Sequence, residues 1–154
     1  MLEVSDSLRT AYATLLSGLT IDGVTIPVFD ERVTGATAQV MYGSAPVECY
    51  IVLHDQTETD ISPKCNFETE CSIQVDINTK FPKGTGGKYL SERISNEVKQ
   101  RIYPSPNIEL PMGPDFQCYG TRLNMSKGLT EFETATDNYR KVLLFIHRVN
   151  QLTT

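Results

Sequence analysis

The sequence lacks several features that define common functional classes. It has no run of Lys and Arg and carries a net charge of −5, which argues against a general nucleic-acid-binding surface. Its longest apolar run, Val142 to Ile146, is far shorter than the roughly 20 residues of a membrane-spanning helix. The first ten residues have neither the basic start nor the apolar centre of a signal peptide. We therefore expect an intracellular protein that does not contact membranes.

Cysteine and histidine are also scarce, and their spacing does not suggest a metal site. No CxxC pair is present, Cys65 and Cys71 are the only close pair, and His54 lies far from His147 in the sequence. We expect no metal ion and no cofactor. Instead, we expect four reduced and mostly buried thiols, at Cys49, Cys65, Cys71 and Cys118.

The residues that are present favour one folded domain over residues 1–154. Apolar residues make up 40% of the chain, which is enough to form one hydrophobic core, and charged residues make up 21%. A first helix is predicted from Ser5 to Ser17, with Ser5 or Asp6 as its N-cap. Gly18 then provides a stop signal.

The stretch from Leu19 to Val33 predicts a β-hairpin. Asp22-Gly23 is a strong turn signal, and the apolar residues from Val24 to Val28 alternate as in a strand. Pro27 cannot donate a hydrogen bond to a neighbouring strand, so we expect this segment at a sheet edge. We interpret Asp22 as a support for the turn backbone. Asp30, Glu31 and Arg32 are interpreted as a solvated charge cluster rather than as an acid/base site.

The rest of the chain predicts four more strands and one more helix. We expect strands at Val47–Asp55 in a central position, at Glu70–Phe81 with one core face and one wet face, and at Phe116–Met125 and Tyr139–Asn150. A helix is expected from Lys88 to Tyr103. The fold is therefore α+β: a mainly antiparallel sheet with two helices packed on one face, in the order α-β-β-β-β-α-β-β.

Long connections separate these elements. The segments Arg32–Pro46, Gln56–Glu68 and Pro104–Asp115 are polar or rich in small residues and proline, and a further polar connection runs from 126 to 137. Ordering such loops costs roughly 1 kcal/mol or more per residue, so we expect them to become ordered against partners. The first and third are therefore candidate contact loops.

Two motifs that invite a catalytic reading are weak. The run KGTGGK, Lys83 to Lys88, lacks the spacing of a phosphate-binding loop, so we interpret it as a turn leading into a helix. His54 and Asp55 lie at a strand end, where they would suit a base and its orienting partner, but no nucleophile motif accompanies them. His147 is expected at the edge of the packed face.

The order of these motifs resembles the tail completion or tail terminator (head–tail joining, neck) proteins of tailed phages. The resemblance is carried by a helix ending in LLSGLT, the hairpin VTIPVFDERV, the strand CYIVLHD, the alternating strand CSIQVDINTKF, the helix GGKYLSERISNEVKQRIY and two closing strands. The connection ERVTGATAQVMYGSAPVE is longer than the compact link of that family.

The resemblance implies a structural virion protein that is assembled in the host cytoplasm. It would form a homo-oligomeric ring at the head–tail junction or tail end, beside portal or connector and tail proteins. DNA would at most pass through the ring without sequence recognition, and the resemblance implies no catalytic residue. Candidate contact residues are Asp22, Gly23, Arg32, Tyr42, Pro106 and Met112.

Two other functions remain open from the residues alone. One is a small hydrolase that uses His54 and Asp55. The other is an adaptor outside the virion that binds one partner through its long loops.

Overall fold

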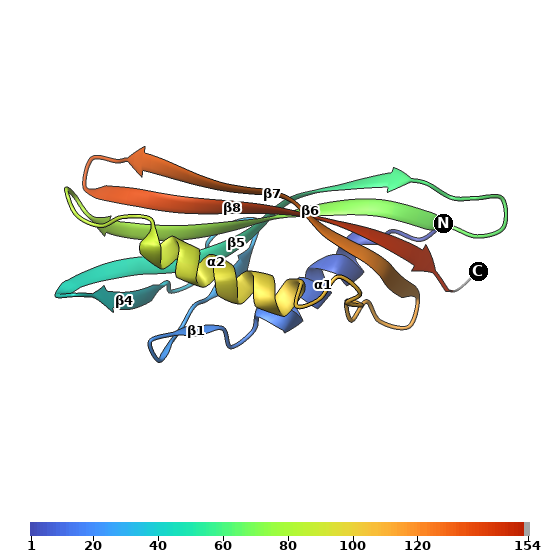
Figure 1. Cartoon of the computed structure of the whole chain (residues 1–154), viewed down its shortest axis with the longest axis horizontal. Helices are drawn as coiled ribbons and strands as arrows, with labels where there is room; N and C mark the ends of the chain where they lie inside the picture. The colour runs from blue at the N-terminus through green and yellow to red at the C-terminus, as the bar shows by residue number, and fades with distance from the viewer. Residues whose placement is uncertain (153–154) are drawn as a thin grey trace.

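The computed structural model describes residues 1–152 and confirms the predicted α+β fold. One long, curved sheet carries both helices on one face, and the molecule is elongated along its strands (Figure 1). The predicted order of helix, strands, helix and two closing strands is kept, and two short strands are added, β3 and β4. The elements are α1 (Ser5–Leu16), β1 (Thr20–Ile21), β2 (Val24–Thr25), β3 (Val28–Asp30), β4 (Ala38–Tyr42), β5 (Ala45–Asp60), β6 (Glu68–Pro82), α2 (Tyr89–Ile102), β7 (Phe116–Phe132) and β8 (Thr136–Gln151).

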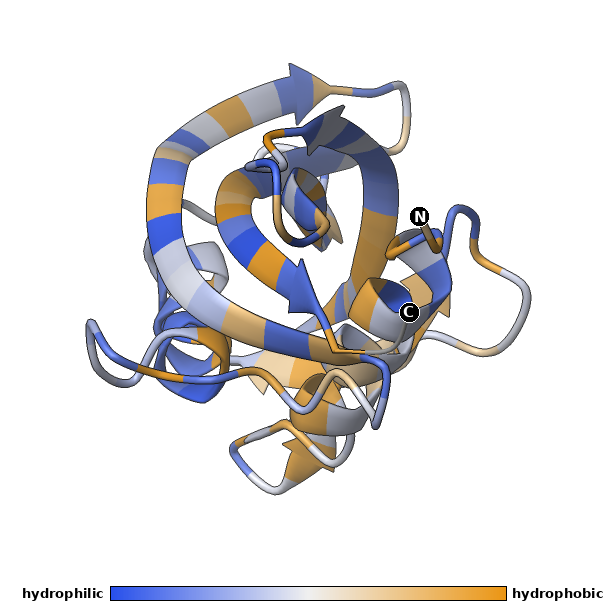
Figure 2. Cartoon of the chain, turned by 90° about the vertical axis from the view of Figure 1, so that its right-hand side faces the viewer, coloured by the Kyte–Doolittle hydropathy of each residue, from blue (hydrophilic) through white to orange (hydrophobic). Residues whose placement is uncertain are grey.

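The main sheet has six strands in the order β3-β5-β6-β8-β7, and β4 also pairs with β5. Every pair is antiparallel except β3 with β5, which is parallel. β5 therefore takes the central position that its apolar sequence predicted, while β7 forms an open edge. Viewed along the long axis, the strands curl and alternate between hydrophobic and hydrophilic residues (Figure 2).

Three segments predicted as loops or connections contain strand residues, which corrects the sequence interpretation. Arg32–Pro46 contains β4, Gln56–Glu68 begins with the end of β5, and the connection 126–137 is largely the end of β7 and the start of β8. These parts of β5 and β7 extend beyond the core, and residues 57–60 are exposed throughout. A strand without a buried face has no alternation of apolar and polar residues, so its sequence reads as a polar linker. The connection Pro104–Asp115 is a loop, as predicted.

The N-terminal elements follow the prediction with two corrections. Helix α1 ends at Leu16 with Ser17 as C-cap, and the following Gly18 has a φ of 72°, which suits glycine. Neither Ser5 nor Asp6 caps the start of the helix; the N-cap is Val4, which makes no side-chain cap bond. The strand predicted from Val24 to Val28 is interrupted at Ile26 and Pro27. Its first part pairs in the β1–β2 hairpin, and its second part becomes edge strand β3, so Pro27 avoids a donor position in the sheet.

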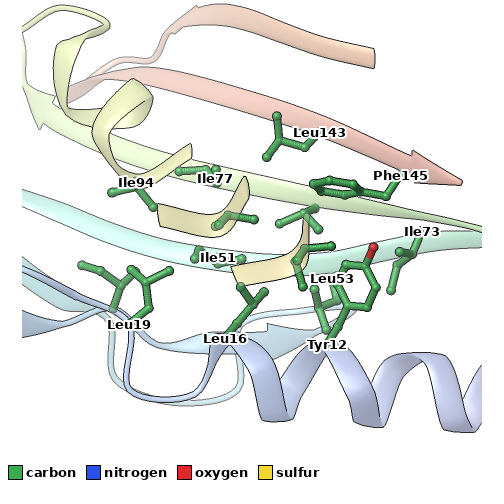
Figure 3. Close-up of a cluster of buried hydrophobic side chains, with 14 of the residues drawn as sticks. Tyr12, Leu16, Leu19, Ile51, Leu53, Ile73, Ile77, Ile94, Leu143 and Phe145 are labelled. Atoms are coloured by element: carbon green, nitrogen blue, oxygen red, sulfur yellow. The ribbon is translucent and has the colours of Figure 1, made fainter. Parts of the chain in front are cut away.

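The hydrophobic core lies between the helices and the face of the sheet that they cover, called the inner face (Figure 3). The predicted stripe of α2 is confirmed, because Leu90, Ile94, Val98 and Ile102 are all fully buried. Each such side chain contributes about 1.5–3 kcal/mol by leaving water. Helix α1 covers the other part of the same face.

His147 corrects the prediction of an edge position, because it lies fully buried within the inner face. Its Nε2 contacts the hydroxyl of Tyr12 on α1, and its Nδ1 lies 2.9 Å from Oγ1 of Thr121 on β7. Burial lowers the pKa of His147 to about 4, so the imidazole is neutral at pH 7. These bonds join a helix to two neighbouring strands through one buried polar group.

The face opposite the helices, called the outer face, also differs from the prediction of a wet surface. Asp76 and Asn78 on β6 are only 2% and 5% exposed. Asp76 lies under Arg140, whose Nε and Nη2 donate to its carboxylate, and Asn78 accepts a 3.1 Å bond from Asn138. Long polar side chains of neighbouring strands thus cover this part of the face in place of a second layer.

Candidate interaction site

The turn residues Asp22 and Gly23 form a tip on the helix side of the molecule. Both have positive φ, 50° and 79°, as a tight hairpin turn requires. The Asp22 carboxylate does not support the local backbone as predicted; it accepts two bonds of 3.1 and 2.8 Å from the Arg93 guanidinium on α2. The pKa of Asp22 is lowered because Arg93 donates to its charged form. The tip is therefore held against α2.

Asp30 and Glu31 are exposed, as their interpretation as a solvated charge cluster predicted, and they share a partner on α1. Arg9 of α1 forms ion pairs with both carboxylates, and its guanidinium donates to the carbonyl oxygens of Leu53 and His54. These contacts fasten α1 to the β3–β5 edge. Arg32, the third member of the predicted cluster, remains exposed.

One end of the molecule gathers aromatic side chains from five elements and is called the aromatic end. Tyr42 packs edge-on to Phe81 at 5.5 Å between ring centroids, Phe81 contacts Tyr139 in the same way, and Tyr89 lies 6.5 Å from Tyr42. Phe132, at the β7–β8 turn, is 73% exposed and lies beside the Lys83 ammonium. Tyr42 and Tyr89 are 41% and 61% exposed, so this end presents aromatic surface to solvent.

The opposite end carries the chain's N-terminus, the end of β8 and the β5–β6 loop, and is called the terminal end (Figure 1). Ile61, Phe67 and Tyr119 are 37%, 44% and 46% exposed there. A hollow of about 230 Å³, called the end hollow, is lined by residues 62–67 and Gln151. Two different partly apolar surfaces therefore lie at the two ends of the long axis.

The loop Pro104–Asp115 is anchored at one side. Pro106 is exposed, whereas Leu110 and Met112 are only 5% and 3% exposed and belong to the core. The Met112 side chain therefore packs internally, while Pro106 is available at the surface. Tyr42, expected in a loop, lies instead on strand β4.

His54 does not pair with Asp55 as the hydrolase hypothesis expected. Its Nε2 lies 3.1 Å from Oδ2 of Asp76, the carboxylate that Arg140 also holds, while Asp55 points into solvent. Arg140 also pairs with Glu131 on β7 at 2.5 Å. The bonds to Asp76 and, to a lesser extent, to Glu131 raise the pKa of Arg140. Within residues 1–152, Asp76 is the only side chain that bonds to the His54 imidazole. These four residues are called the outer-face network, and they join β5, β6, β8 and β7.

The glycine-rich run Lys83–Lys88 binds a carboxylate of its own chain. The Lys83 ammonium and the Gly84 N–H donate to Asp137 at 2.8 and 2.9 Å, and both bonds lower the pKa of Asp137. Gly86 has a φ of 91°, and an added Cβ would lie 2.3 Å from the Phe81 ring. The run is thus a turn shaped around Asp137 and Phe81, as its interpretation as a turn predicted.

The cysteines follow the predicted pattern. All four are free, Cys49, Cys71 and Cys118 are buried, and Cys65 is exposed in the end hollow. Burial raises the pKa of Cys49 and Cys71 to about 12, so neither thiol ionises at pH 7. In the part of the chain that the structure describes, no three His, Cys, Asp or Glu side chains are arranged to hold a metal ion. No helix in residues 1–152 is long and apolar enough to cross a membrane.

Comparison with known proteins finds a shared fold. No protein-family model matches the chain, and no curated protein sequence matches it either. Among solved structures, the chain is similar to one in the "Virion of native gene transfer agent (GTA) particle", with a TM-score of 0.57 and 17% sequence identity. The match covers 96% of this chain and 91% of that chain, so the two share their fold over nearly their whole length.

Proposed function

We propose that this protein is a structural component of a tailed-phage-like virion. In this role it forms a homo-oligomeric ring at the head–tail junction or tail end. The observation that carries the proposal is the shared fold with a chain of a gene transfer agent virion over 96% of the sequence. The predicted resemblance to tail completion and tail terminator proteins supports the same class of function.

The distribution of apolar surface supports a ring. A symmetric dimer uses the same patch on both copies, whereas a ring needs two different patches that complement each other. The aromatic end and the terminal end differ in composition, and each exposes apolar side chains. The two sheet faces, in contrast, are largely covered by the chain's own residues.

The proposal retains those candidate contact residues that are exposed to solvent. Arg32, Tyr42 and Pro106 are exposed, and the Asp22-Gly23 tip projects from the helix side. We assign these positions to contacts with neighbouring subunits or with adjoining portal, connector and tail proteins. The net charge of −5 suits a ring through which DNA passes without sticking.

The outer-face network favours a structural role over the hydrolase alternative. A hydrolytic base needs a nucleophile or a water site within about 3 Å and a group that stabilises developing charge. The carboxylate that contacts His54 is already held by the Arg140 guanidinium, and the network links four strands. The contacts of the outer-face network are those needed to hold these four strands together.

Deletion of the gene in the host that carries it tests the proposed function. We expect filled heads and tails that do not join, or tails with irregular ends, by electron microscopy, with normal particles restored by a second copy of the gene. Normal particles in the deletion strain would contradict a role in the virion.

A further inference from the structure

We propose that one edge of the main sheet binds the phosphate backbone of DNA through four lysines. They are Lys88 at the N-cap of α2, Lys99 on α2, Lys127 on β7 and Lys141 on β8, and together they are called the lysine edge. The inference rests on the proposed function for the identity of the polyanion, because DNA passes through a ring at the head–tail junction.

The fold brings these lysines together around a short part of β7. The Lys99 ammonium donates to Oγ of Ser126 at 3.3 Å. The Lys88 ammonium lies 3.9 Å from the point where a side chain on Gly128 would begin. Lys141 is in register with Gly128, and directly opposite residues of antiparallel strands lie on the same sheet face. Three lysines from separate parts of the sequence therefore meet on the helix side of β7.

Lys127 extends the lysine edge to the outer face. It lies between Ser126 and Gly128 in β7, and successive side chains of a strand point to opposite faces. From Met125 to Phe132 the register of β7 with β8 has no irregularity, and in residues 1–152 β7 pairs with β8 alone. Alternate backbone N–H groups of this stretch are therefore open at the edge of the sheet.

The positive charge of the lysine edge is not balanced locally. In the described part of the chain, no carboxylate lies within ion-pair distance of these four ammonium groups. Glu131, the only acid in the β7 sequence, is held by Arg140 at 2.5 Å. Glu92 is exposed on the same flank of α2 as Lys88 and Lys99, and it offsets one of the four charges. Three positive charges therefore remain at this edge of a chain whose net charge is −5.

The composition of the lysine edge favours a phosphate backbone over a protein surface. Ser126, Gly128 and Thr130 are small or polar, and the only large apolar residue among them, Leu129, is half-buried. The centres of protein interfaces are enriched in aromatic residues and depleted in lysine. A phosphate backbone needs cations, hydroxyl groups and free backbone N–H groups, and the lysine edge provides all three.

Three surplus charges predict weak binding that is independent of DNA sequence and sensitive to salt. Each phosphate that a lysine neutralises contributes about −0.9 to the slope of log K against log salt concentration. The excess of acidic residues elsewhere in the chain disfavours wider contact with DNA. Electrostatic contacts of this kind allow DNA to slide, which suits a ring through which DNA passes.

An NMR titration of the isotope-labelled full chain with a short DNA duplex of mixed sequence, at low salt, tests the proposal. We expect the backbone amides of residues 126–130 and of Lys88 and Lys99 to shift, and the shifts to disappear as salt is added. Amides around Lys64, an exposed lysine at the terminal end, should stay unchanged.

Variants give the matched comparison. K99Q combined with K127Q should bind the duplex about tenfold more weakly and reduce the salt slope by about two, because two phosphate contacts are lost. K64Q, the control, should bind like the wild type.

Absence of shifts at low salt, shifts centred on another surface, or equal binding by the double variant and K64Q would overturn DNA binding at the lysine edge. A double variant that binds DNA normally but no longer assembles would also overturn it, and would assign the edge to a contact between copies. These measurements use the isolated chain, so a negative result leaves the proposed function to be decided by the gene deletion.

Discussion

The two faces of the main sheet are stabilised by different chemistry. The inner face is sealed by two helices over apolar side chains such as Ile51, Ile77 and Phe145, all fully buried. The outer face has no second layer, and its buried Asp76 is covered by the Arg140 guanidinium from the next strand. Residues of the same chain thus cover most of both faces. The exposed aromatic surface lies instead at the two ends of the long axis.

The largest expected effect comes from the inner face. F145A removes a fully buried phenyl ring that packs against Tyr12 and His147, so it should cost about 4 kcal/mol in the free energy of unfolding. The neighbouring residue Ile146 points to the outer face and is partly exposed, so I146A should cost about 1 kcal/mol. Denaturant unfolding measures both values. Equal losses would mean that the two faces are sealed equally well.

On the outer face, D76N should cost about 3 kcal/mol, because the Arg140 guanidinium and His54 lose the buried carboxylate that they share. Its control is D55N, at the neighbouring exposed carboxylate of β5, which should change the free energy of unfolding by less than about 0.5 kcal/mol. The same unfolding experiment at pH 7 compares them. A larger loss for D55N would restore the His54–Asp55 pairing that the sequence suggested.

Acid should weaken the inner face through His147. The folded state keeps this imidazole neutral down to about pH 4, whereas the unfolded chain takes up a proton below about 6.5. Because the unfolded state binds more protons in this window, the free energy of unfolding should fall by up to about 3 kcal/mol as the pH drops from 6.5 to 4.

The variant H147Q should flatten this slope between pH 6.5 and 4.5. Carboxylates whose pKa is lowered by folding, such as Asp137, also contribute to the free energy of unfolding, and this contribution is lost only at still lower pH. A slope that persists in H147Q would assign the acid sensitivity to other groups.

The smallest of these effects belongs to the glycine-rich turn. G86A should cost about 2 kcal/mol, because the residue has a φ of 91° and the new Cβ would collide with the Phe81 ring. At Gly87 an added Cβ meets nothing within 4 Å, so G87A should be nearly neutral. Thermal unfolding of the two variants separates a required glycine from a permissive one. Similar melting temperatures would show that the turn adapts.

The sequence predicts the long elements that have a buried face, and it misses the short strand β4 and the strand ends that have no buried face. The stripe Leu90, Ile94, Val98 and Ile102 fixed the second helix because its period of about 3.6 residues is visible directly. The ends of β5 and β7 project past the core, where neither face is buried and the period of two vanishes. Predicted loops at these places were wrong for that reason.

The candidate site was harder to predict from the sequence, because its contacts join residues that are far apart in the chain. Asp22 with Arg93 and Asp30 with Arg9 depend on how the helices dock. The alternation of Phe145, His147 and Val149 along β8 would have indicated a buried histidine, since all three share the inner face. His54 contacts Asp76 diagonally across β5 and β6, because Asp76 is in register with Val52, and this register cannot be read from a local pattern.

Quantitative mass spectrometry of purified particles from the host that carries this gene tests the central claim most directly. A ring at the head–tail junction or tail end predicts that the protein is retained at a constant number of copies per particle, greater than one, through repeated purification. Absence of the protein from intact, functional particles would contradict the account.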